Sequence, residues 1–113
     1  MTVEQVCETL GAAPVWEGAD LKTEVSGGYA GDFLSWVMSR LRAGNVWLTV
    51  MGNVNTIAVA VLAEAGCVVL CEDAPFDDDA LARAKGEGLP VLRTSLPVFE
   101  AAVKLGALPE AKR

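Results

Sequence analysis

A unit made of an apolar strand, a short polar turn and a helix recurs three times along this chain. It restricts the fold more than any other feature of the sequence. The clearest copy comprises strand 46–50, turn 51–55 and helix 56–65; a second spans residues 67–85, and a shorter third spans 89–105. Strands that alternate with helices predict βαβ units and a mostly parallel sheet. We therefore expect an α/β fold, a three-layer sandwich in which helices flank a mostly parallel central sheet.

Length and charge limit the classes of partner. The chain has 113 residues, the size of one domain, and we take 1–113 as that domain with its core at 3–105. Its net charge of -6 argues against a nucleic-acid partner, because binding to phosphate backbones needs a basic patch. No apolar run approaches the roughly 20 residues that span a bilayer, so we expect no membrane partner. The N-terminus has no basic signal-peptide region, which favours a cytoplasmic location with reduced cysteines.

The N-terminal segment predicts a helix followed by a weak strand. Thr2 and Gln5 have the spacing of a capping box, and Gly11 ends the helix that they begin. Residues 21–25 alternate between apolar and polar side chains, which is typical of a half-exposed strand.

A glycine-rich loop, residues 26–31, is the first candidate binding site. We expect Gly28 to adopt a positive φ, and such glycines let a ligand approach the backbone. Asp32 is expected to cap a helix that ends at Gly44, and the start of that helix would suit an anion. The alternative is a tight connection without a ligand. The candidate ligand-binding residues here are Gly27, Gly28, Tyr29 and Asp32.

The turn after strand 46–50 is the second candidate. Gly52 permits a sharp turn, and Asn53 and Asn55 offer amide donors and acceptors. Ligands of open parallel sheets bind outside the carboxyl ends of the strands, which is where this turn falls. The alternative is simple capping of the next helix by Asn55 or Thr56.

Thr94 and Ser95 form the third candidate, because they follow the last strand. Their hydroxyl groups could contact a ligand at the same edge of the sheet. Alternatively, Ser95 caps the last helix, with Pro97 in the first turn where proline is tolerated.

Metal sites are poorly supported. An acidic pair at 72–73 and an acidic run at 77–79 suit the positive N-terminal end of a helix. A magnesium site formed by these carboxylates is the weaker alternative. Cys67 and Cys71 fall on one face of a strand, but Cys7 is distant and the chain has no histidine, so a zinc site lacks a fourth ligand. We interpret the cysteines as buried apolar residues and expect no metal and no cofactor.

Catalytic patterns are missing. Without histidine there is no histidine-based acid–base pair or triad. The chain also lacks a GxxxxGK[ST] phosphate loop and a GxGxxG turn after a strand. We therefore expect that this protein is not an enzyme.

The order of these segments resembles the DRTGG domain over nearly the whole chain. The similarity is greatest to small stand-alone DRTGG proteins, which are related to the N-terminal domain of HPr kinase/phosphorylase. The segments that carry it are 25–32, 46–49, 57–62 and 88–94, together with Phe99.

This resemblance implies an α/β regulatory domain that forms a homodimer. Related domains occur beside CBS domains in pyrophosphatases that adenine nucleotides regulate, and some stand-alone forms are encoded near bacterial hydrogenase genes. The resemblance does not imply kinase activity, because the phosphate loop of the kinase lies in a domain absent from this chain.

Two turns depart from the family's pattern. Where the family often has Gly-Asp-Arg, this chain has Gly52-Asn53-Val54, and the glycine pair after the next strand is replaced by Glu72-Asp73. These acidic residues would repel phosphates.

The sequence therefore predicts a non-catalytic regulatory or interaction module. We expect a homodimer, with the apolar helix 56–62 facing a second subunit, that senses a small nucleotide-like molecule or binds a protein partner. The alternative is an accessory subunit of a kinase-related or hydrogenase-associated enzyme system.

Overall fold

The structure is a computed structural model and describes residues 1–109. Five helices and five strands are formed within this part of the chain. In chain order they are α1 (Val3–Leu10), β1 (Ala13–Pro14), β2 (Gly28–Ala30), α2 (Leu34–Arg40), β3 (Val46–Thr49), α3 (Val54–Leu62), β4 (Cys67–Leu70), α4 (Asp78–Glu87), β5 (Val91–Arg93) and α5 (Val98–Gly106).

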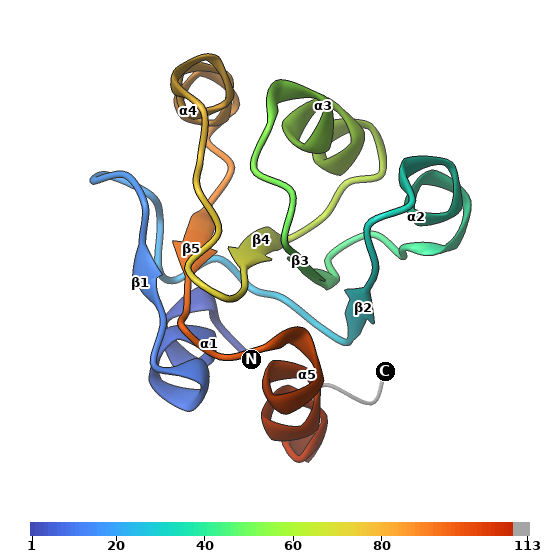
Figure 1. Cartoon of the computed structure of the whole chain (residues 1–113). Coiled ribbons are helices and arrows are strands. Elements are labelled where there is room, and N and C mark those ends of the chain that lie inside the picture. Colours follow the sequence, from blue (N-terminus) through green and yellow to red (C-terminus); the bar gives the residue numbers. More distant parts are fainter. Residues whose placement is uncertain (110–113) are drawn as a thin grey trace.

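The strands form one sheet in the order β1-β5-β4-β3-β2. β2 to β5 are parallel, and only β1 runs antiparallel, against β5. Helices α2, α3 and α4 cover one face of the sheet, and α1 and α5 cover the other (Figure 1). The predicted three-layer α/β sandwich with a mostly parallel sheet is therefore confirmed.

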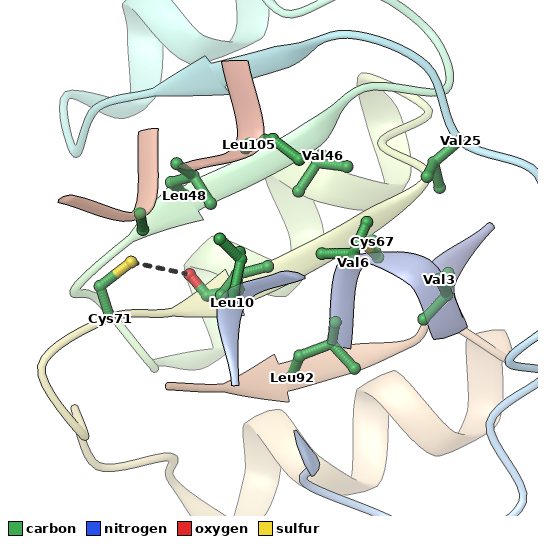
Figure 2. Packing of buried hydrophobic residues seen from close by; sticks show 12 residues of the cluster. Val3, Val6, Leu10, Val25, Val46, Leu48, Cys67, Cys71, Leu92 and Leu105 are labelled. Atoms are coloured by element: carbon green, nitrogen blue, oxygen red, sulfur yellow. Dashed lines mark hydrogen bonds between the residues drawn. The ribbon is translucent and has the colours of Figure 1, made fainter. Parts of the chain in front are cut away.

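Each face of the sheet has its own hydrophobic core. On one face, α1 and α5 pack against the strands; Figure 2 shows Val6, Leu10 and Leu105 lying over Leu48 and Leu92. On the other face, a second cluster surrounds the fully buried Trp47 and Ile57. All four residues of β4 are buried, as expected for a central parallel strand that helices cover on both faces.

The first helix forms as predicted, but the strand predicted at 21–25 does not. The capping box of Thr2 and Gln5 is present, and Gly11 ends α1 in the left-handed conformation. The carbonyl oxygens of Leu21 and Thr23 accept hydrogen bonds from the N–H groups of Glu4 and Val3 at 2.9 and 3.0 Å. The segment thus satisfies the free donors at the start of α1, and only an isolated bridge between Thr2 and Glu24 remains.

The glycine-rich segment is not a loop as predicted, because part of it forms β2 beside β3. Gly27, not Gly28, has the positive φ, at 67°. Gly44 does not end the next helix either: α2 ends at Arg40, with Leu41 at its C-cap. Gly44 instead accepts a hydrogen bond from Ser26 N–H at 2.9 Å, just before β2.

The apolar character of α3 has an internal explanation. This helix lies between α2 and α4 (Figure 1), and its neighbours cover its flanks. Ile57 is fully buried and belongs to the core. On its outer side Leu62 is 70% exposed, and it is the large apolar side chain of α3 that remains most available to a second subunit.

Candidate functional site

The carboxyl ends of β2 to β5 meet at one edge of the sheet, which we call the carboxyl edge (residues 31–33, 50–53, 71–74 and 94–96). The structure places six of the nine predicted site residues at this edge or in the helix turn beside it. They are Asp32, Gly52, Asn53, Asn55, Thr94 and Ser95. The other three, Gly27, Gly28 and Tyr29, lie at the start of β2 and within it.

Asp32 joins two strands and does not cap α2, so that prediction was wrong. Its Oδ1 accepts hydrogen bonds from the Thr49 hydroxyl at 2.5 Å and from Val50 N–H at 3.0 Å. Helix α2 begins after Phe33 and has no side-chain cap. The Oδ1 atom of this carboxylate therefore holds the end of β2 against the end of β3.

The turn after β3 is closed by backbone from another part of the chain. A Cβ added at Gly52 would lie 2.0 Å from the carbonyl oxygen of Pro75, and Asp77 N–H donates to Gly52 O at 2.9 Å. Glycine is thus required here by close backbone approach. Asn53 caps α3 by accepting from Thr56 N–H at 3.1 Å, which corrects the assignment of the cap to Asn55 or Thr56. Asn55 lies exposed in the first turn.

Thr94 is a structural residue of the core. Its hydroxyl donates to Leu10 O at 2.7 Å and accepts from Leu96 N–H at 3.2 Å, which ties the end of α1 to the end of β5. Ser95 is exposed, but it does not cap α5 as predicted, because Pro97 occupies the N-cap position.

The turn after β4 is acidic and strained. Glu72 and Asp73 both have positive φ, at 57° and 52°, and Ala74 N–H closes the turn onto Cys71 O at 3.1 Å. Side chains with a Cβ disfavour this left-handed region. These are the positions where the resemblance led us to expect glycines. One basic group, the Arg93 guanidinium, donates to Ala74 O from the next strand at 3.0 Å.

The cysteine thiols are poor nucleophiles. Burial, followed by the charge of Cys7, raises the pKa of Cys67 to about 12. Burial raises the pKa of Cys71 to about 11, with further contributions from the negative charges of Glu72 and Asp32. At neutral pH both thiols are protonated and pack as small apolar groups. Within residues 1–109, His, Cys, Asp and Glu form no group of three or more that could hold a metal ion.

An exposed aromatic pair at the start of α2, formed by the N-cap residue Phe33 and Trp36, was missed as a surface feature. Phe33 and Trp36 contact each other edge to face with ring centroids 5.4 Å apart, and the Arg40 guanidinium lies 4.0 Å above the Trp36 ring. The two rings are 61% and 51% exposed. The sequence contained a signal for this surface pair, because the apolar residues of the helix cover more than one of its faces. Some of them therefore had to remain outside the core.

A pocket of about 150 Å³ lies between β2 and α5, away from the polar turns. Gly28, Ala30, Leu48, Leu105 and Gly106 contribute to its lining. It is mostly apolar and can accept an aliphatic side chain or a comparably small apolar group.

The fold and this site define an α/β module whose polar strand ends are largely engaged in internal hydrogen bonds. The family model of the DRTGG domain matches residues 5–108. The chain therefore belongs to the DRTGG domain family. A search of curated proteins found no match.

The fold is similar to that of a solved regulatory region. The solved structure is the crystal structure of the CBS and DRTGG domains of the regulatory region of Clostridium perfringens pyrophosphatase, complexed with the activator diadenosine tetraphosphate. The TM-score is 0.68 at 11% sequence identity, and the match covers 98% of this chain and 49% of that chain. The present chain thus spans about half of that regulatory region. In residues 1–109 no helix has the length and apolar character needed to cross a bilayer.

Proposed function

We propose that this protein is a non-catalytic regulatory or interaction module that works as a homodimer and responds to a small nucleotide-like ligand. One observation carries the non-catalytic role: at the carboxyl edge, Asp32, Asn53 and Thr94 are each used in hydrogen bonds that hold the fold. An assay of ATP turnover by the purified protein tests this point, with no turnover expected. Turnover that Asp32→Asn abolishes would contradict it.

The dimer is assigned to the outer surface of α2 and α3. Four large exposed apolar side chains lie on these neighbouring helices or at the start of α2, and two of them, Phe33 and Trp36, contact each other. The four are Phe33, Trp36, Met38 and Leu62. Light scattering should give twice the monomer mass, and Trp36→Glu with Leu62→Glu should give the monomer with an unchanged circular dichroism spectrum. A monomeric wild-type protein would rule out this assignment.

The ligand is assigned to the carboxyl edge, where Asn55 and Ser95 are exposed and free to reach a small molecule. The support for a nucleotide is the family and the neighbour's bound activator. Glu72 and Asp73 lie at the same edge, so repulsion should weaken binding as phosphates are added. We therefore expect adenosine and AMP to bind more tightly than ATP or diadenosine tetraphosphate.

A thermal-shift series with these four compounds tests the ligand assignment. A ligand at 100 times its Kd adds about 2.7 kcal/mol to the free energy of unfolding. Asn55→Ala and Ser95→Ala should reduce the ligand-induced shift in melting temperature. The control Ser39→Ala, at an exposed position of α2, should leave this shift unchanged. The absence of a shift with every compound would remove the ligand from the proposal and leave the interaction role.

An accessory subunit of a kinase-related or hydrogenase-associated enzyme system is the second candidate. It is supported by apolar side chains outside the α2–α3 surface, since Phe99 on α5 is 78% exposed. Affinity purification from the native host after cross-linking distinguishes the two candidates. Recovery of an enzyme subunit at constant stoichiometry, and its loss from the Phe99→Glu variant, would favour the accessory role.

A further inference from the structure

In the part of the chain that the structure describes, residues 1–109, the strand β2 leaves backbone hydrogen-bonding groups free at the edge of the sheet. Among these residues, β3 is its one neighbour in the sheet. Gly27 O accepts from Val46 N–H at 3.3 Å, and Gly31 N–H donates to Leu48 O at 3.1 Å. Because successive residues of a strand direct these groups to opposite sides, the N–H and C=O groups of Gly28 and Ala30 point away from the sheet. Both residues are exposed.

Although β2 has only three residues, this edge lacks the charged side chains and the proline that normally prevent pairing. Edge strands are usually protected by charged side chains, proline or bulges. At the opposite edge, β1 has only two residues and one of them is Pro14. By contrast, residues 26–31 contain serine, glycine, alanine and one tyrosine, without charge or proline. Among residues 1–109, the β2 edge is therefore a short, unpaired template for another strand.

The pocket between β2 and α5 lies directly beside the free edge. A Cβ at Gly28 would come within 3.0 Å of Leu105 Cδ2, so the missing side chain keeps the backbone and α5 close. Gly106, Val103 and Phe99 follow one another at helical spacing on α5, and Val103 and Phe99 are 58% and 78% exposed. A strand added to β2 would direct alternate side chains toward this apolar row.

The two ends of the edge carry opposite charges. Asp32 follows β2 directly; its Oδ1 bonds to Thr49 and Val50 at the end of β3, and the residue is exposed at the carboxyl end. At the amino end, Asn45 donates to Ser26 O at 2.7 Å and accepts from Arg42 N–H at 3.0 Å, which holds the exposed Arg42 beside the start of β2. A matching strand has a basic side chain at the end near Asp32 and an acidic one at the end near Arg42.

We propose that β2 binds an extended segment of a partner protein, which becomes a sixth strand of the sheet. An aliphatic side chain of this segment enters the pocket between β2 and α5, and oppositely charged side chains flank it to match Asp32 and Arg42. Backbone hydrogen bonds to Gly28 and Ala30 supply affinity, while the pocket and the charges supply selectivity. In Figure 1, β2 forms an outer edge of the sheet between the layers that contain α2 and α5. The inference rests on the proposed role as an interaction module and names its binding surface.

A phage-displayed heptapeptide library, selected on the complete chain, provides the test. Enriched peptides are synthesised and titrated by fluorescence anisotropy. We expect alternating aliphatic residues between one basic and one acidic residue, and slower amide exchange at Gly28 and Ala30 in the complex. Ala30→Pro removes an outward N–H, and Gly106→Leu fills the pocket from a position where a Cβ meets nothing within 4 Å. Each should weaken binding by at least about tenfold.

The matched control is Gly86→Leu, a helical glycine on α4 that also has open space around it. It should leave the affinity unchanged. Failure to enrich any peptide, or binding that survives both variants, overturns the proposal. Protection of Gly28 and Ala30 that rises with protein concentration without peptide assigns the edge to a second copy instead, which also overturns it. Since dimerisation and nucleotide binding are measured without peptide, their failure is distinguishable from failure here.

Discussion

The carboxyl edge has many polar side chains and the β2 edge has few, yet it is the β2 edge that offers more unused hydrogen-bonding groups. The carboxyl edge is rich in polar residues, yet Asp32 and Thr94 there bond to other parts of the same chain. The β2 edge has almost no polar side chains, yet the outward backbone groups of Gly28 and Ala30 find no partner within residues 1–109. Polar residues in a sequence thus indicate where hydrogen bonds form. The tertiary structure decides whether these bonds are made within the chain or with a partner.

Gly52→Ala should produce the largest effect, because its Cβ would collide with the carbonyl oxygen of Pro75 at 2.0 Å. We expect a loss of about 3 kcal/mol in the free energy of unfolding, measured by urea denaturation. Gly86→Ala is the matched control: nothing lies within 4 Å of its Cβ, and it should stabilise the protein by roughly 0.5–1 kcal/mol. A neutral Gly52→Ala would mean that this turn has room for a ligand after all.

Thr94→Val should cost about 2 kcal/mol, because it leaves Leu10 O and Leu96 N–H without their hydroxyl partner. Chemical denaturation of the wild-type protein, Thr94→Val and Thr94→Ser at equal protein concentration measures the loss. Thr94→Ser retains the hydroxyl and should recover most of the stability. If Val and Ser behaved alike, the hydroxyl would be free for other use at the carboxyl edge.

Asp73→Gly should stabilise the protein by about 1 kcal/mol, because glycine tolerates the positive φ of this turn. Glu64→Gly is a suitable comparison, since Glu64 has a φ of 60° after α3, far from the carboxyl edge. Differential scanning calorimetry should show a higher melting temperature for both. A gain at residue 64 alone would show that the Asp73 side chain has a compensating contact.

Ala30→Lys should have the smallest effect on folding, within about 0.5 kcal/mol, because residue 30 is exposed at the free edge. Thermal unfolding followed by circular dichroism would measure it. A loss above about 1 kcal/mol would indicate that this chain itself uses the β2 edge.

Much of the architecture is predictable from local patterns. The three strand–turn–helix units were recognised because β3 and β4 are short apolar runs followed by polar turns. The parallel sheet then places Asn53 and Thr94 at one edge without knowledge of their contacts. Capping of α1 by Thr2 follows from spacing alone.

The errors arise where a distant segment decides the outcome. Residues 21–25 alternate like a strand, but their carbonyl oxygens are taken by the start of α1. Residues 28–30 have weak strand character, and pairing with β3 forms β2 nonetheless. Gly52 is explained only by Pro75, which lies 23 positions later in the chain and approaches through the fold.

The strand order has a consequence for how the chain folds. From β2 to β5, each strand pairs with the next one in the sequence, so these pairings form between segments made in succession. Helix α1 and strand β1 are made first, but they pack against α5 and β5 at the other end of the chain. We expect the N-terminal segment to dock last, after α5 exists, since contacts between distant segments form late. During synthesis, we therefore expect the face of the sheet that α1 and α5 cover to stay exposed until α5 has been made.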